Sequence, residues 1–232
     1  GEITERRFRE DLTEAVRQSL AHTIKLVGKT GTNIVLGKVG NTTSTFYPDA
    51  DPETSSVDGW VRRAVVSETF ATIRAGAGTT FSDTGTTAVC GTLEASATSN
   101  EYDNITRAIF VFDTTTIADS DTVDSATFSL TLTAKADQLG GNGAMNITKA
   151  STASNTAIAN SDYEATKGAG FDTDYSTDKD ITGITASGYW DNTLNANGIT
   201  NVSTTAVSKF SCRSTWDIDN NTTGITWGSA QY

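Results

Sequence analysis

The clearest pattern of apolar and polar residues in the chain lies between positions 107 and 133. Four apolar residues follow one another at 109–112, so apolar side chains point to both faces of an extended segment there. Over 126–133 apolar and polar residues alternate at period two, which is typical of a strand with one buried face. The apolar positions of this second run are Ala126, Phe128, Leu130 and Leu132. The connector between the runs is polar, so the stretch predicts strand, turn, strand.

Short apolar runs separated by Gly, Asn, Asp, Ser and Thr continue through most of the chain after residue 41. Such spacing predicts an all-β sandwich or barrel rather than alternating strands and helices. The predicted strands are 59–63, 70–74, 88–93, 107–112, 126–133, 145–150, 181–184 and 209–216. Segments 161–165 and 194–202 are predicted to be helical or turn-like.

Residues 4–22 follow a different pattern, in which large apolar residues recur every four positions among charged ones. This spacing predicts an amphipathic helix with one apolar stripe. The stripe consists of Phe8, Leu12, Val16 and Leu20. It needs a partner, which is either the rest of the same chain or another chain, and we expect another chain. We therefore expect residues 1–40 to form a helix and extended arm for anchoring or oligomerisation, and residues 41–232 to form the sandwich.

Composition narrows the possible partners. The net charge of −11 argues against nucleic acid, because phosphate binding needs a basic surface. We expect no insertion into a membrane, since no segment approaches the ~18 apolar residues that a spanning helix requires. The two cysteines, Cys90 and Cys212, do not form a disulfide scaffold. Two buried free thiols are favoured over a bridge between them.

Several segments, taken in order, resemble the DNRLRE-type jelly-roll domain. Arg107, Phe112 and Asp113 match its signature R-x-x-x-x-F-D. The other matching segments are Asp58-Gly-Trp-Val-Arg-Arg, Glu68-Thr-Phe-Ala-Thr-Ile-Arg-Ala-Gly and Lys209-Phe-Ser-Cys-Arg-Ser-Thr-Trp-Asp. The resemblance covers roughly residues 46–227. It implies a jelly-roll-like antiparallel β-sandwich, as found in phage virion proteins, bacterial surface proteins and polysaccharide-binding modules.

One feature departs from that resemblance. Such domains usually end in a hydrophobic strand of the type P-x-L-x-V-x-Y, whereas this sequence ends at Trp227-Gly-Ser-Ala-Gln-Tyr232. An unpaired sheet edge invites association. The final strand is supplied by residues beyond Tyr232, or the edge is closed by another element of the same chain, and donation of a strand by a partner chain stays open as a further alternative.

Together these features lead us to expect a non-enzymatic structural protein of a phage virion. It would decorate the capsid, form a head fibre or belong to the tail, with its sandwich on the exterior surface. Its partners would be other virion proteins and copies of itself, in a homo-oligomer such as a trimer. The alternatives are a secreted or cell-surface module for carbohydrate binding or adhesion, and a self-assembling subunit of a surface filament.

Catalytic chemistry has little support in the residue pattern. His22 is the only histidine, and it falls near the end of the expected helix. Most acidic residues lie in loop clusters at alternating positions, where they usually form turns. We expect no catalytic residues.

A structural calcium ion is the one cofactor that the sequence suggests. Asp217, Asp219 and Asn221 have the one-three-five spacing of oxygen ligands in a calcium loop. Thr222 replaces the glycine of an EF-hand, and Gly228 replaces its final glutamate. The alternative is a polar hairpin turn without metal.

Carbohydrate binding would require an exposed aromatic platform beside polar groups. The best candidates are Tyr189 and Trp190, which follow Gly188 and precede Asp191-Asn192. The alternative role for this pair is packing over one end of the sandwich.

Overall fold

The computed structural model of the chain describes residues 24–26, 33–38, 42–85, 87–136, 139, 143–185 and 188–225. This part is mainly β, with two sheets and a few short helices. Strand pairs within the described ranges are antiparallel apart from one, and an antiparallel fold is what the resemblance implies. The expected amphipathic helix with Phe8, Leu12, Val16 and Leu20 lies outside the described residues.

The larger sheet is built around one long central strand. Its strands are β4 (Asp58–Thr69), β5 (Thr80–Ser82), β6 (Leu93–Ala95), β7 (Glu101–Phe112), β9 (Ala144–Lys149), β10 (Lys179–Asp180) and β12 (Ser208–Ser214). They run in the order β10-β9-β12-β7-β4-β5, and β6 also pairs with β7. β4 follows one edge of β7 along its length, while β12 and β6 share the other edge.

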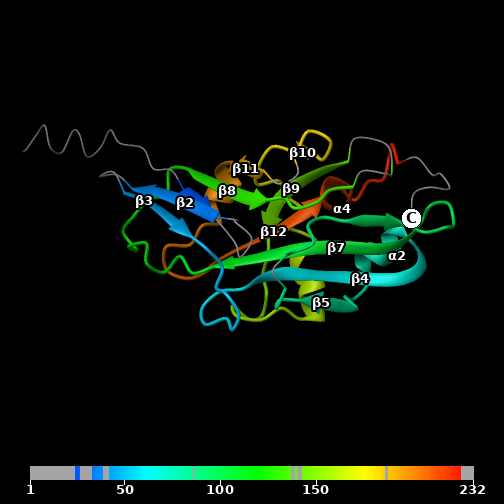
Figure 1. The fold of residues 1–232 in the computed structure, drawn as a ribbon, viewed down its shortest axis with the longest axis horizontal. Coiled ribbons are helices and arrows are strands. Elements are labelled where there is room, and N and C mark those ends of the chain that lie inside the picture. The colour runs from blue at the N-terminus through cyan, green and yellow to red at the C-terminus, as the bar shows by residue number, and fades with distance from the viewer. Residues whose placement is uncertain are drawn as a thin grey trace, which may run out of the picture.

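The second sheet lies across from it (Figure 1). Its strands are β1 (Ile24–Leu26), β2 (Asn33–Lys38), β3 (Thr42–Phe46), β8 (Ala126–Thr131) and β11 (Tyr189–Thr193). The order is β11-β8-β1-β2-β3, and the pairing of β1 with β8 is parallel. β1 and β2, which fall within the predicted arm, pair antiparallel with each other. Both strands also pair with β8, so they belong to this sheet.

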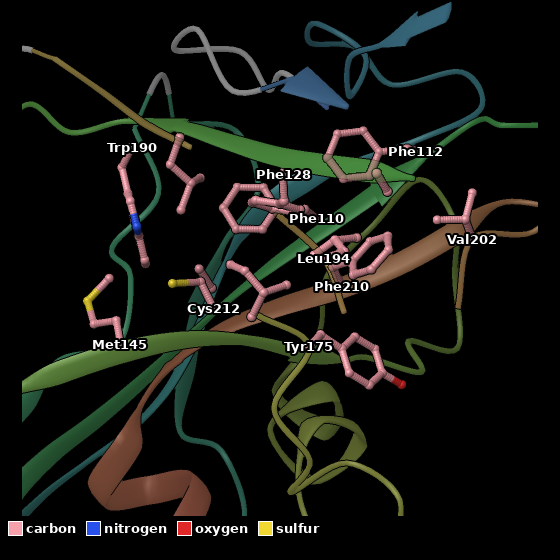
Figure 2. Packing of buried hydrophobic residues seen from close by; sticks show 14 of the residues in the cluster. Phe110, Phe112, Phe128, Met145, Tyr175, Trp190, Leu194, Val202, Phe210 and Cys212 are labelled. Atoms are coloured by element: carbon pink, nitrogen blue, oxygen red, sulfur yellow. The ribbon is translucent and has the colours of Figure 1, made fainter. Parts of the chain in front are cut away.

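A cluster of aromatic rings fills the space between the two sheets (Figure 2). Phe110 and Phe112 come from β7, Phe210 from β12 and Phe128 from the facing strand β8. Phe128 meets Phe110, Phe112 and Phe210 edge to face at centroid distances of 5.3, 5.8 and 5.7 Å. Burying each ring contributes about 1.5–3 kcal/mol, so this cluster holds the sheets together.

The other face of the larger sheet is buried as well. Ile105, Ile109 and Val111 of β7 contact a second apolar cluster there. Two short helices contribute to it, α2 (Phe70–Ala75) through Ile73 and η1 (Asn160–Thr166) through Tyr163. The continuous apolar run at 109–112 reflects this burial on both faces of β7.

The structure corrects some local predictions and confirms others. Residues 70–74 form helix α2 instead of a strand, with Thr69 capping its start through a bond from Thr72 N. Residues 181–184 form turns, and only the end of 88–93 is a strand, at β6. The predicted helical segments are confirmed by η1 and by α3 (Ala196–Thr200). The predicted strand at 209–216 ends at Ser214, where α4 (Thr215–Asp219) begins.

Candidate functional site

Two buried arginines lie next to each other on the outer face of the larger sheet. Arg107 is in β7 and Arg213 is in β12, one residue beyond the pair Cys212 and Ala108 in the register. Both side chains are fully buried. Helix α4 follows β12 directly and brings Asp217 back over them. The turn from strand to helix therefore places one carboxylate between two guanidinium groups.

The contacts within this group, which we call the arginine clamp (Arg107, Asp217 and Arg213), are short. Arg107 donates from Nε to Asp217 Oδ2 and from Nη2 to Oδ1, both at 2.7 Å. Arg213 donates from Nε to the same Oδ2 at 2.8 Å. Arg107 also donates to the Tyr163 carbonyl at 2.6 Å, and its guanidinium carbon lies 3.9 Å from the centre of the Tyr163 ring. The clamp thus joins β7, β12, α4 and η1.

A second carboxylate extends the clamp toward the surface. Asp172 accepts from Arg213 Nη1 at 2.8 Å and from Arg74 Nη2 at 2.7 Å. Arg74, at the end of α2, donates from Nε to the Asp217 carbonyl at 2.7 Å. Three arginines and two aspartates therefore connect four separate segments of the chain.

The charge balance keeps Asp217 ionised. Burial by itself would raise the pKa of this carboxyl, but the charges and hydrogen bonds of Arg107 and Arg213 outweigh it and hold the pKa well below the ordinary value of 3.8. A carboxylate in this state does not exchange protons near neutral pH. The geometry supports a structural role for the clamp.

The three residues of the predicted calcium loop lie in different surroundings. Asp217 is buried and faces two arginines, whereas Asp219 and Asn221 are exposed. The spacing is that of a short helix, α4, ended by Asn220 in the left-handed conformation. The three side chains are therefore not gathered around one point. Within the described ranges, no group of three or more His, Cys, Asp or Glu residues is arranged to hold a metal ion.

The predicted aromatic pair is split by the alternation of strand β11. Tyr189 is 60% exposed, whereas Trp190 is 2% exposed and belongs to the core. Trp190 pairs with Leu130 of β8 in the sheet register. Successive strand residues point to opposite faces, so the two rings cannot form one platform. Of the two rings, only that of Tyr189 is exposed to solvent.

An apolar cavity of about 540 Å³ lies beside the aromatic cluster. Its walls come from strands β6, β7, β8, β9, β11 and β12, from helix α4, and from the loops around 87–92, 132–136 and 181–184. Figure 2 shows Trp190 and Met145, which line it, at one end of the core, with Tyr175 and Val202 at the other. The core is thus densely packed at one end and hollow at the other.

The two cysteines meet at this end of the core. Both are free thiols, with Cys212 buried and Cys90 partly buried against the same cluster. Burial, together with a hydrogen bond to Cys90, raises the pKa of the Cys212 thiol. Gly91 has a φ of +55°, and a Cβ there would stand 2.9 Å from Ser214 N, so the loop packs directly on β12.

Comparison with protein-family models, curated proteins and solved structures finds no match for this chain. In the described part of the chain, no helix has both the length and the apolar character needed to cross a membrane. The resemblance to jelly-roll domains therefore remains a prediction.

Sequence reasoning missed both the clamp and the cavity. Arg107 and Arg213 each lie within a segment that carries the resemblance, yet nothing in the sequence pairs them with each other or with Asp217. One signal was present: each arginine interrupts a strand whose neighbours are apolar or small. A charged residue at such a position is buried only when it has a partner.

Proposed function

We propose that this protein is a non-catalytic structural component on the exterior of a phage particle, where a jelly-roll-like sandwich is displayed and the N-terminal helix anchors it. The observation that supports this best is the arginine clamp. Its most deeply buried charges bind one another and tie strands to helices. Such a group stiffens a framework, and because Asp217 stays ionised it does not supply an acid or base for proton transfer.

The clamp also links the proposal to the family resemblance. Arg107 comes from the R-x-x-x-x-F-D segment, and both Arg213 and Asp217 come from the segment 209–217. These two segments are neighbours in the larger sheet. The charged residues that carry the resemblance therefore build the frame of the sandwich, as expected for a scaffold that tolerates varied surfaces.

Location on a particle is tested directly. Antibodies raised against the purified protein should label intact phage particles from the source organism in immunogold electron microscopy. Mass spectrometry of washed particles should recover the same chain. Its absence from purified particles, with the protein instead in the cell-free medium, would exclude the virion role.

Anchoring by the N-terminal segment is tested on the full chain. Leu12→Asp and Val16→Asp each place a charge in the predicted apolar stripe. We expect either change to abolish incorporation into particles and to lower the oligomeric state in sedimentation equilibrium, with an unchanged melting temperature. Glu14→Gln, on the predicted charged face, is the matched control. Normal incorporation of both aspartate variants would refute the anchoring role.

A carbohydrate-binding or adhesion module is the second candidate, and two observations favour it. Tyr189 presents its ring to solvent, and a separate polar pocket of about 290 Å³ opens elsewhere on the surface. Its lining includes Lys149, Thr173, Asn197 and Thr200. A glycan array with the wild-type protein, Tyr189→Ala and Asn197→Ala separates the candidates. Glycan binding that either variant removes supports the module, and no binding in any of the three supports the structural role.

A further inference from the structure

The two halves of the core differ in how completely they are filled. At one end the rings of Phe110, Phe128 and Phe210 are in edge-to-face contact. At the other end, Leu130, Met145 and the neighbouring side chains line the cavity of about 540 Å³. Protein interiors are normally packed as densely as organic crystals, so a hollow of this size is unusual. Its volume falls within the range of about 300–1,000 Å³ that is typical of small-molecule sites.

Among the described residues the lining is mostly apolar, with one cation, Lys135, that is already engaged, and one carboxylate, Glu94, that accepts a hydrogen bond from Asn104. Lys135 donates from Nζ to the carbonyls of Ile181, Thr182 and Ile184 at 3.0, 2.8 and 2.5 Å. This contact fastens the loop after β8 to the turn at 181–184, and so holds two walls of the cavity together. An anionic ligand would have to displace these carbonyls from Lys135. The site therefore disfavours anions.

Two residues of the lining, Thr92 and Trp190, each have a buried polar atom without a hydrogen-bond partner among the described residues, and the indole nitrogen of Trp190 can act only as a donor. Trp190 Nε1 is buried and has no hydrogen-bond partner among the described residues. Indole nitrogen is a donor only, and a buried donor without a partner loses its hydration with nothing in return. The same donor repels a cation. A neutral ligand with an acceptor atom would satisfy this N–H.

We propose that this cavity binds an uncharged, mostly apolar small molecule that carries one hydrogen-bond acceptor, with Trp190 Nε1 as the donor. Leu130, Leu132, Met145, Ile181 and Ile184 supply the apolar surface. A medium-chain ketone or a related neutral compound has this chemistry. Its chain would replace water along the apolar walls, which is the main source of affinity.

The test uses the full-length protein and two neutral probes. N-phenyl-1-naphthylamine fluoresces in apolar surroundings and lacks a carbonyl acceptor, and 2-nonanone carries one. We expect saturable binding of the dye at one site per chain and its displacement by 2-nonanone. Nonanoate, of similar length but anionic, should displace it at least tenfold less well.

Variants locate the site. Leu132→Trp and Ile181→Trp, which add bulk at two different walls, should each weaken dye binding more than tenfold. Val66→Trp is the matched control, because Val66 is 91% exposed and is not part of the lining. Trp190→Phe keeps an apolar ring and removes the donor. This variant should leave the affinity for the dye nearly unchanged. It should lower the affinity for 2-nonanone about three- to tenfold, the usual range for one hydrogen bond.

Circular dichroism and melting curves show whether each variant is folded. The proposal is overturned if the folded wild-type protein does not bind the dye, which would also be the result if another part of the chain filled the cavity. It is equally overturned if both folded wall variants bind the dye as the wild type does. If Trp190→Phe weakened the binding of the dye and of 2-nonanone equally, Nε1 would not be the donor to the ketone.

Discussion

Arg107 holds Asp217 in a bidentate ion pair, with Nε and Nη2 each 2.7 Å from a different carboxylate oxygen. The two residues come from the middle of β7 and from a helix near the end of the described chain. Neither is exposed to solvent by more than a few per cent. This ion pair is therefore buried on one face of the larger sheet, and the aromatic cluster is buried on the other face.

Removing the charge of Asp217 should destabilise the fold strongly. In Asp217→Asn, Arg107 and Arg213 keep their charges but lose their buried counterion. Breaking a buried pair in this way costs about 3–5 kcal/mol. Urea unfolding followed by circular dichroism measures the change. Glu164→Gln is the control, since its pair with Lys167 is half exposed and contributes at most about 1 kcal/mol. A loss below about 1 kcal/mol in Asp217→Asn would show that the clamp does not hold the frame.

The same residue should make the fold sensitive to acid. The folded pKa of Asp217 lies well below its ordinary value of 3.8 because the two arginines outweigh burial. Its stabilising contribution is therefore present above about pH 4 and is lost as the pH falls through the range below. The difference in unfolding free energy between wild type and Asp217→Asn should shrink steadily from pH 5 to pH 2. A difference that stays constant over this range would contradict the prediction.

Asp174 should have the opposite effect on how the stability of the fold depends on pH. Burial, together with the nearby charges of Asp178 and Asp219, raises its pKa from 3.8 to about 6. The folded state then binds the proton more tightly than the unfolded chain, so the residue destabilises the fold progressively as pH rises from about 4 to 6. Asp174→Asn should melt higher than wild type at pH 7, and the gain should vanish below about pH 4. Asp119→Asn, on an exposed loop, makes the same change in net charge and is the control. An unchanged melting temperature in Asp174→Asn at pH 7 would count against this assignment.

The two thiols should differ in reactivity. Cys212 is fully buried with a raised pKa, whereas Cys90 is only partly buried. Because the thiolate is the reactive form, Ellman's reagent at pH 8 should modify at most one thiol per native chain. The second should react only in guanidinium chloride. Cys90→Ser should therefore show no fast-reacting thiol, and rapid modification of Cys212 in that variant would mean that the core is open.

Much of the sheet framework could be predicted from the sequence. The alternation at 126–133 and the run at 109–112 correspond to β8 and the end of β7. Short apolar runs were less informative, because periodicity cannot separate a short strand from one turn of helix. Residues 70–74 illustrate this, since Ile73 is buried by a helix that Thr69 caps.

Strand β11 was missed for a different reason. Its buried positions are Trp190 and Asn192, and the second is polar. Asn192 is accommodated because its amide donates to the Phe128 carbonyl at 3.2 Å. An alternation with a polar residue on the buried face does not resemble a strand until its partner is known.

The sequence by itself determined that the chain is mainly β, where most long strands lie and which segments carry apolar faces, because these properties depend on local periodicity and turn residues. Only the tertiary structure decided which charges meet, that Trp190 is buried while Tyr189 is exposed, and where the core is left hollow. Those outcomes depend on contacts between residues far apart in the chain, such as Arg107 and Asp217, and on the loss of solvent around them. The local pattern of apolar and polar residues does not indicate which distant residues come into contact.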